Sequence, residues 1–206
     1  FRFRFLTLFI IMKGLKNIGN TCYLNSALQM VLNIPDLCNL ITTHSHLSSN
    51  LKLISDFINE YHNGENKVLI PLQIKELVGK RKKMFGGYGQ NDSSEFMIFL
   101  FDIIDEELNK NKIKYNIDNI IGLKSRINIK CKLVKCLTES EHDEMNLFLY
   151  LPLTNSLTES YRIYKTNEKL MGNNKYFCEK CNKNTIARKR TETIHWPNNL
   201  IIILRR

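Results

Sequence analysis

Residues 14–26 read Gly-Leu-Lys-Asn-Ile-Gly-Asn-Thr-Cys-Tyr-Leu-Asn-Ser, and this stretch decides how the rest of the chain is interpreted. It places one cysteine, Cys22, where a polar turn that contains glycine becomes an amphipathic helix. Apolar residues recur at helical spacing after it, at Leu24, Ala27, Leu28, Val31 and Leu32. The segment Asn33-Ile34-Pro35 ends that pattern. The sequence therefore predicts that Cys22 lies in or just before the first turn of a helix.

This position favours an ionised sulfur. The unpaired N–H groups and the positive end of the dipole at a helix start stabilise an anion. They lower the pKa of a thiol from about 8.5 toward neutrality, and the thiolate is the attacking species. Asn17 and Asn20 add amide donors, and Gly19 lets the backbone approach a ligand closely. Such donors are what the oxyanion of an acyl-transfer reaction requires. The alternative is that Cys22 is only a small, partly buried apolar side chain.

The composition argues against a nucleic-acid partner. The chain has 206 residues, 43% of them hydrophobic, and a formal net charge of +10. Its lysines are scattered, and the densest cluster, residues 80–83, is expected to be a solvated loop. Because no contiguous basic stripe with interleaved aromatic residues occurs, we expect no nucleic-acid binding.

Residues 1–11 imitate a signal peptide, since arginines precede a short apolar run. No cleavage site of small residues follows, and the run is shorter than the ~20 apolar residues that span a bilayer. Met12 would be a natural start. We therefore expect residues 1–11 to be a leader or upstream reading frame outside the fold, and we expect no membrane partner.

Six cysteines, two of them in a C-x-x-C pair, favour metal binding or catalysis over a disulfide framework. That usage is typical of a reducing compartment, so an intracellular location, cytoplasmic or nuclear, is expected. The pair is Cys178 and Cys181, whose thiolates could occupy half of a tetrahedral zinc site. Cys131 and Cys136 are the candidates for the other half.

The two halves of the chain have different patterns. Helical spacing predicts the helix at Cys22 and further helices at 51–61, from 70 through 78, and from Asp92 or Ser93 to about 109. Alternation predicts strands at 125–130, 147–151, 186–194 and 200–204, and one helix is expected within 157–170. The sequence thus predicts an α+β protein with a helical lobe at 12–110 and a β-rich lobe at 111–206.

A polar cluster at residues 89–96, Gly-Gln-Asn-Asp-Ser-Ser-Glu-Phe, introduces the longest predicted helix. By itself it is an ordinary helix cap, in which Asp92 or Ser93 caps the helix and acidic side chains complement its dipole.

Taken in order, these segments resemble the ubiquitin-specific proteases, which are papain-like cysteine deubiquitinases. Residues 14–26 resemble their cysteine box, and residues 89–96 resemble their glutamine-aspartate-glutamate-phenylalanine box. Residues 176–206 resemble the second half of their zinc knuckle followed by a strand, here 197–204. The resemblance covers residues 12–206.

The resemblance implies a papain-like fold, with a helical thumb and β-rich fingers that lead into the palm. It implies that Cys22 attacks the carbonyl carbon of ubiquitin's C-terminal glycine and that Asn17 donates to the oxyanion. Gln90, Asp92 and Glu95 would bind the ubiquitin tail, whose arginines suit carboxylates. Ubiquitin and ubiquitinated proteins are the expected partners. No cofactor is expected for catalysis.

Two departures from the family pattern bear on these expectations. The upstream zinc half is normally C-x-x-C, but Val134 stands at the second ligand position and Cys136 follows later. Either a longer loop brings Cys136 to a structural zinc, or the zinc site is degenerate. The family's catalytic histidine lies beyond the strand at 200–204, and none of this chain's five histidines lies in a matching motif. We therefore expect the chain to be a fragment, inactive or weakly active alone.

Two other functions remain open from sequence. One is a non-catalytic module that binds ubiquitin without cleaving it, although Cys22 and Asn17 are both present. The other is a zinc-ribbon nucleic-acid binder, which would depend on the basic charge and Cys178 and Cys181 alone and would show strong salt dependence.

Overall fold

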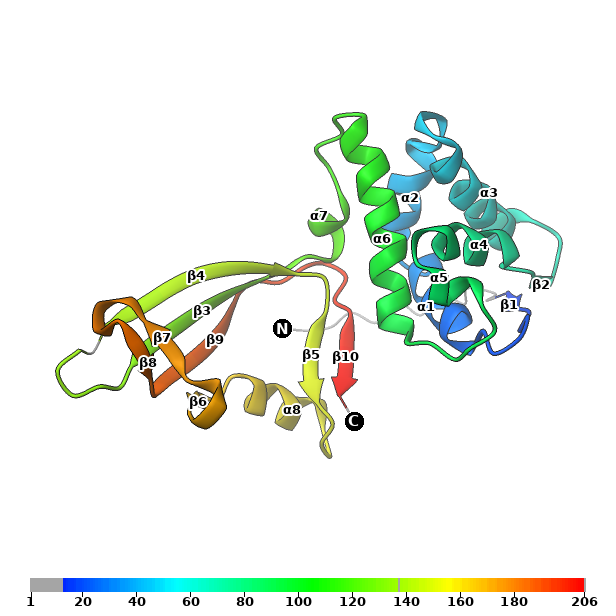
Figure 1. Cartoon of the computed structure of the whole chain (residues 1–206). Helices are drawn as coiled ribbons and strands as arrows, with labels where there is room; N and C mark the ends of the chain where they lie inside the picture. Colours follow the sequence, from blue (N-terminus) through cyan, green and yellow to red (C-terminus); the bar gives the residue numbers. More distant parts are fainter. Residues whose placement is uncertain (1–12, 137, 206) are drawn as a thin grey trace. The chain divides into compact units, whose positions relative to one another are not determined.

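The computed structural model describes residues 13–136 and 138–205, so the leader predicted at 1–11 lies outside the described residues. The chain divides into two compact units, one ending at Asn116 and one beginning at Ile117. Figure 1 shows helices through the first unit, coloured blue to green, and most of the strands in the second, coloured green to red. The predicted α+β class, helical first and β-rich second, is confirmed.

The helical unit contains six α-helices among the described residues. They are α1 (Cys22–Leu32), α2 (Pro35–Thr43), α3 (Ser49–Asn63), α4 (Leu72–Arg81), α5 (Lys83–Gly86) and α6 (Ser93–Lys110). A 3-10 turn, η1 (Ser45–Leu47), separates α2 from α3, and two short strands, β1 (Gly14–Leu15) and β2 (Val68–Leu69), pair in parallel.

Helix α3, predicted at 51–61, has a side-chain cap at its start and a glycine at its end. The Ser48 hydroxyl accepts a hydrogen bond from the Leu51 N–H at 3.1 Å, and Gly64 ends α3. Helix α2 was not predicted. Pro35 ends one helical pattern but also occupies the first position of α2, where its missing N–H costs nothing. Leu37, Leu40 and Ile41 are buried, so the helix also has an apolar face.

The core of this unit forms where α1 packs against α6. Both helices bury an apolar stripe, and each buried leucine, isoleucine or phenylalanine side chain stabilises the fold by roughly 1.5–3 kcal/mol. At the start of both helices lie the rings of Tyr23, Phe85 and Phe96. Their centroids are 5.8 Å (Tyr23 to Phe85), 5.7 Å (Tyr23 to Phe96) and 5.4 Å (Phe85 to Phe96) apart. This cluster fixes the first turn of α1 beside the first turn of α6.

The β-rich unit contains a four-stranded antiparallel sheet in the order β4-β3-β9-β6. Its strands are β3 (Leu123–Cys131), β4 (Glu139–Asn146), β6 (Glu168–Leu170) and β9 (Ala187–His195). The remaining elements are α7 (Ile117–Ile121), α8 (Leu157–Tyr164), the parallel pair β5 (Leu149–Pro152) and β10 (Ile202–Arg205), the hairpin β7 (Tyr176–Cys178) and β8 (Lys183–Thr185), and the 3-10 turns η2 (Gly172–Asn174) and η3 (Glu179–Cys181).

Strand β4 was not predicted, because its sequence, Glu-Ser-Glu-His-Asp-Glu-Met-Asn, has no apolar alternation. Its backbone pairs with β3 along its whole length. Cross-strand ion pairs add to the ladder: Lys124 Nζ lies 3.0 Å from an Asp143 carboxylate oxygen, and Arg126 Nε lies 2.9 Å from the other. Strand β4 is therefore stabilised by its backbone pairing with β3 and not by burial of apolar side chains.

Among the helices of the described residues, none combines the length and apolar character needed to cross a bilayer.

Candidate functional site

Cys22 is the first residue of α1, and its side chain is exposed. The residues on both sides of it are buried, Thr21 at 0% exposure and Tyr23 at 4%. Tyr23 is held in the aromatic cluster, and burial raises the pKa of its phenol. The buried side chains of Thr21 and Tyr23 thus hold the first turn of α1 in place, while the Cys22 side chain is exposed to solvent.

The segment before Cys22 is attached to α1 by two side-chain amides of that helix. Asn25 Nδ2 donates to the Leu15 carbonyl oxygen at 3.0 Å, and Gln29 Nε2 donates to the Lys13 carbonyl oxygen at 2.8 Å. The chain between Leu15 and Cys22 therefore has to fold back in a tight turn. Two residues there have positive φ, Gly19 at 105° and Asn20 at 50°.

A second segment, the glycine-rich residues after α5, lies against this turn. Asn20 Nδ2 donates to the Tyr88 carbonyl oxygen at 2.9 Å. A Cβ at Gly19 would lie 3.1 Å from Tyr88 Cδ1, so the Tyr88 ring packs directly on the glycine. The buried Lys75 donates to the Gly86 carbonyl oxygen at 2.8 Å, and its ammonium group lies 5.5 Å from the centroid of the Tyr88 ring. The sequence predicted a flexible turn here and gave no sign of these contacts.

The predicted ubiquitin-binding residues lie at the start of α6. Asp92 is its N-cap: Oδ1 accepts a hydrogen bond from the Glu95 N–H at 2.9 Å and another from the Ser94 hydroxyl. These hydrogen bonds, the one from Ser94 first, lower the pKa of the Asp92 carboxyl. Gln90 is exposed and Glu95 is half-buried. The contact of Tyr23 with Phe96 brings this helix start beside that of α1, so the two sequence motifs meet.

No histidine of the described helical unit, residues 13–116, makes a hydrogen bond with Cys22. His44 Nδ1 lies 2.8 Å from the Leu40 carbonyl oxygen, and His62 Nε2 lies 3.0 Å from the Leu32 carbonyl oxygen. The His62 nitrogen is 4.0 Å from the sulfur of Cys38. This contact between Cys38 and His62 is unsuited to nucleophilic chemistry, because Cys38 is buried and burial raises its pKa to about 11.

The four cysteines considered for zinc form a cluster in the β-rich unit. Their sulfurs all lie within 4.8 Å of one another. Cys131 ends β3, Cys136 lies in the following turn, Cys178 ends β7 and Cys181 ends the 3-10 turn η3. The Cys136 and Cys178 sulfurs are 3.6 Å apart. Sequence reasoning named these four residues, and the fold brings them together.

The loop after β3 explains the unusual spacing. The Cys136 N–H donates to the Leu133 carbonyl oxygen at 2.9 Å, which closes a turn. Val134 lies in that turn at 90% exposure, and the turn directs Cys136 back to the other sulfurs. The longer loop thus brings Cys136 to the other three sulfurs, which is the arrangement that a zinc site would need.

Threonine hydroxyl groups form hydrogen bonds with two of the four cysteine sulfurs. Thr138 Oγ1 lies 2.8 Å from the Cys136 sulfur, and its hydrogen bond is the main reason that the pKa of Cys136 is lowered to about 6. The neighbouring Cys136 raises the pKa of Cys181 to about 12. Four clustered sulfur ligands are a donor set that suits tetrahedral Zn²⁺, so these residues could hold a structural zinc ion.

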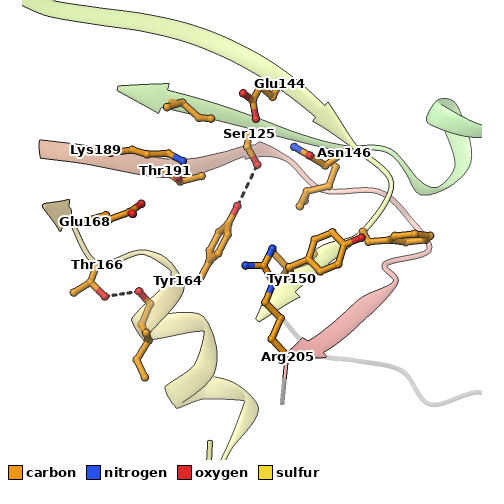
Figure 2. A pocket seen from close by; sticks show the side chains of 15 residues that line it. Ser125, Glu144, Asn146, Tyr150, Tyr164, Thr166, Glu168, Lys189, Thr191 and Arg205 are labelled. Atoms are coloured by element: carbon orange, nitrogen blue, oxygen red, sulfur yellow. Dashed lines mark hydrogen bonds between the residues drawn. The ribbon is translucent and has the colours of Figure 1, made fainter. Parts of the chain in front are cut away.

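The β-rich unit contains a cavity of about 450 Å³, lined by residues of the sheet, β5, α8 and β10; Figure 2 shows these side chains. The Tyr164 hydroxyl lies 3.4 Å from Ser125 Oγ, and the Arg205 guanidinium lies 4.9 Å from the centroid of the Tyr150 ring. None of the site residues predicted from sequence lines this cavity. Its walls come from segments far apart in the chain, which no local pattern reveals.

The chain is similar in sequence to a known protein family and to individual proteins of that family. A family model described as ubiquitin carboxyl-terminal hydrolase matches residues 13–206. The chain is 32% identical over 227 residues to ubiquitin carboxyl-terminal hydrolase 25 of Arabidopsis thaliana, covering 94% of this chain and 33% of the relative. It is 26% identical over 205 residues to ubiquitin carboxyl-terminal hydrolase 42 of Homo sapiens, covering 92% and 15%. The chain thus spans a third or less of the length of these relatives.

Proposed function

Since the chain belongs to the ubiquitin carboxyl-terminal hydrolase family, we propose that it is the part of a thiol-dependent deubiquitinase that carries the nucleophile Cys22. The enzyme would cleave isopeptide or peptide bonds after the C-terminal glycine of ubiquitin. The observation that carries the proposal is the exposed Cys22 at the first position of α1, beside the turn that contains Asn17 and the start of α6.

The proposed chemistry proceeds through a thioester. The Cys22 thiolate attacks the glycine carbonyl carbon, and the oxyanion of the tetrahedral intermediate accepts hydrogen bonds from Asn17 and from N–H groups of the turn. The C–N bond then breaks, and the amine leaves with a proton from a general acid. Water hydrolyses the thioester, which frees the ubiquitin carboxylate and returns the thiol.

Proton transfer in this scheme needs an imidazole. We propose, from the family resemblance, that this histidine comes from outside the 206 residues. The contacts of His44 and His62 support this, because both rings are engaged with backbone carbonyl oxygens elsewhere in the helical unit. The papain-like arrangement of thumb, fingers and palm belongs to the same proposal.

Substrate recognition would use the start of α6. Asp92 and Glu95 would pair with arginines of the ubiquitin tail, and Gln90 would contact the same tail. Asp92 has two carboxylate oxygens, and both hydrogen bonds that cap the helix are made to Oδ1. One carboxylate can therefore cap the helix and also accept from a guanidinium group.

The four clustered cysteines would hold one structural zinc ion. The metal would cross-link the turn after β3 to the turn after β7, and it would take no part in the reaction. The hydroxyls of Thr138 and Thr185, 2.8 Å and 3.4 Å from the sulfurs of Cys136 and Cys131, support such a site as partners of its ligands.

A ubiquitin that carries a C-terminal vinyl sulfone tests the proposal. We expect it to label the natively expressed protein, with the adduct mapped to Cys22 by mass spectrometry and absent from the Cys22→Ala variant. The Cys38→Ala variant is the matched control, because it removes a buried cysteine, and it should be labelled like the wild type. Ubiquitin binding without labelling would instead identify a non-catalytic module.

A further inference from the structure

Thr21 occupies the N-cap position of α1 but does not use its side chain to cap the helix. A threonine at this position ordinarily has extended backbone angles and accepts a hydrogen bond from an N–H of the first turn. Thr21 has φ −96° and ψ 23°, and its hydroxyl makes no such bond. The usual reason for a threonine here is therefore absent, and its buried hydroxyl is used elsewhere.

The hydroxyl of Thr21 joins the two ends of the cysteine turn. It donates to Asn17 Oδ1 at 3.1 Å and accepts from the Ile18 N–H at 3.0 Å. Asn17 Oδ1 also accepts from the Gly19 N–H at 3.1 Å and from the Thr21 N–H at 3.2 Å. Three donors thus converge on one side-chain oxygen.

This convergence fixes which way the Asn17 amide faces. An amide has a carbonyl end that only accepts and an NH₂ end that only donates. The opposite orientation would place the NH₂ against two backbone N–H groups and would lose both of their hydrogen bonds. With Oδ1 held inside the turn, Nδ2 is the end directed away from it, on a residue that is itself exposed.

We propose that Thr21 is a positioning residue for oxyanion stabilisation: it holds the Asn17 amide so that its NH₂ donates to the oxyanion formed on attack by Cys22. This inference rests on the proposed function. Thr21 is 0% exposed, so it acts through Asn17 and not by touching the substrate. Since the oxyanion exists only after attack, loss of this hydroxyl slows the chemical step and leaves substrate binding unchanged.

The test compares two variants of Thr21 in the natively expressed protein, with a fluorogenic ubiquitin substrate. Thr21→Val keeps the shape and removes the hydroxyl, and we expect kcat to fall about tenfold, the effect of one hydrogen bond, with KM within about twofold. Thr21→Ser keeps the hydroxyl and should restore most of kcat. Alkylation of Cys22 by iodoacetamide forms no oxyanion, so its rate should be the same in both variants.

A double-mutant cycle separates positioning from general support of the turn. Asn17→Ala removes the donor and should lower kcat by about 10²–10³. If Thr21 acts through Asn17, adding Thr21→Val to that variant changes kcat no further. Multiplying effects, or full activity of Thr21→Val beside an active wild type, would overturn the inference.

Asn17→Asp keeps the test decisive even where Thr21→Val does not fold. The aspartate oxygen can still accept from the turn, but the NH₂ donor is gone, so we expect a folded protein as slow as Asn17→Ala. An active Asn17→Asp variant would contradict the inference. A wild-type protein that neither cleaves ubiquitin substrates nor reacts with the vinyl sulfone would instead contradict the proposed function.

Discussion

The two units of this chain each hold a cysteine site, and the sites are built in opposite ways. The turn at Cys22 is made by consecutive residues, 17–22, whose hydrogen bonds close on one another. The four-cysteine cluster joins two turns, 131–136 and 178–181, that meet only because their strands fold into the same unit. The turn at Cys22 is visible in the sequence as one motif of consecutive residues. The four-cysteine cluster does not depend on one fixed spacing, because a longer loop can still bring Cys136 to the other sulfurs.

The two kinds of site also expose sulfur differently. Cys22 is exposed alone at a helix start, whereas Cys131 and Cys178 are buried among other sulfurs. One arrangement suits attack on a substrate and the other suits holding a metal ion. Five experiments would break or sharpen this contrast, from the largest expected effect to the smallest.

The Cys22→Ala variant should show the largest effect. We expect cleavage of a fluorogenic ubiquitin substrate to fall on the order of 10⁴-fold or more, because a nucleophile and its base act as a unit. The melting temperature should stay near that of the wild type, since the sulfur is exposed. Substantial remaining cleavage would show that the nucleophile lies elsewhere.

Metal stoichiometry tests the cluster. One zinc per chain is expected in the wild type, and Cys136→Ser should lose most of it, with a lower melting temperature for the β-rich unit. The double variant Cys136→Ser/Val134→Cys, which recreates the C-x-x-C spacing, should not recover the metal, because residue 134 points to solvent at 90% exposure. Recovery in that variant would contradict the observed loop, and a wild type without metal would remove the zinc proposal.

Two variants of Asp92 separate its cap from its charge. Asp92→Ala should lose about 1 kcal/mol of unfolding free energy with the cap and raise KM about tenfold. Asp92→Asn keeps a capping side chain without the charge, so it should lose less stability than Asp92→Ala while KM still rises. An unchanged KM in both variants would reject a role in binding the ubiquitin tail.

The acid behaviour of Asp92 follows from its lowered pKa. Hydrogen bonds favour the ionised carboxyl in the folded state. Its stabilisation is therefore complete above the unfolded pKa of about 4 and is lost as pH falls through the folded pKa. Urea midpoints of wild type and Asp92→Ala should differ most at neutral pH, and the difference should shrink as pH falls below about 4. A difference that does not shrink in acid would mean that the cap does not depend on charge.

The smallest effect concerns Cys38. At pH 7.5, iodoacetamide should modify Cys22 and leave Cys38 intact in the native protein, because Cys38 is buried and its pKa is about 11. Mass spectrometry of native and urea-denatured samples measures the difference. Native modification of Cys38 at the rate of Cys22 would show that burial does not distinguish them.

Sequence patterns predicted the elements whose own residues carry the signal. Helices α1, α3 and α6 have apolar stripes, and α3 and α6 also have side-chain caps, whereas strands β3, β5 and β9 have alternation or apolar runs. Strand β4 lacks both and exists through its pairing with β3. Helix α2 was missed because Pro35 was interpreted only as the end of the preceding helix. Proline is also common at the first position of a helix, and three apolar side chains that follow Pro35 are buried.

By itself the sequence determined the position of Cys22 at a helix start, a helix cap at Asp92 or Ser93, and the four cysteines that are candidates for one site, because each follows from residue type and short-range spacing. Only the tertiary structure decided that Cys136 reaches the other sulfurs, that Tyr88 lies on Gly19, and that the hydroxyl of Thr21 turns to Asn17. The reason is physical: loop paths and hydrogen-bond partners depend on which backbones pack together, and short-range spacing does not encode that packing.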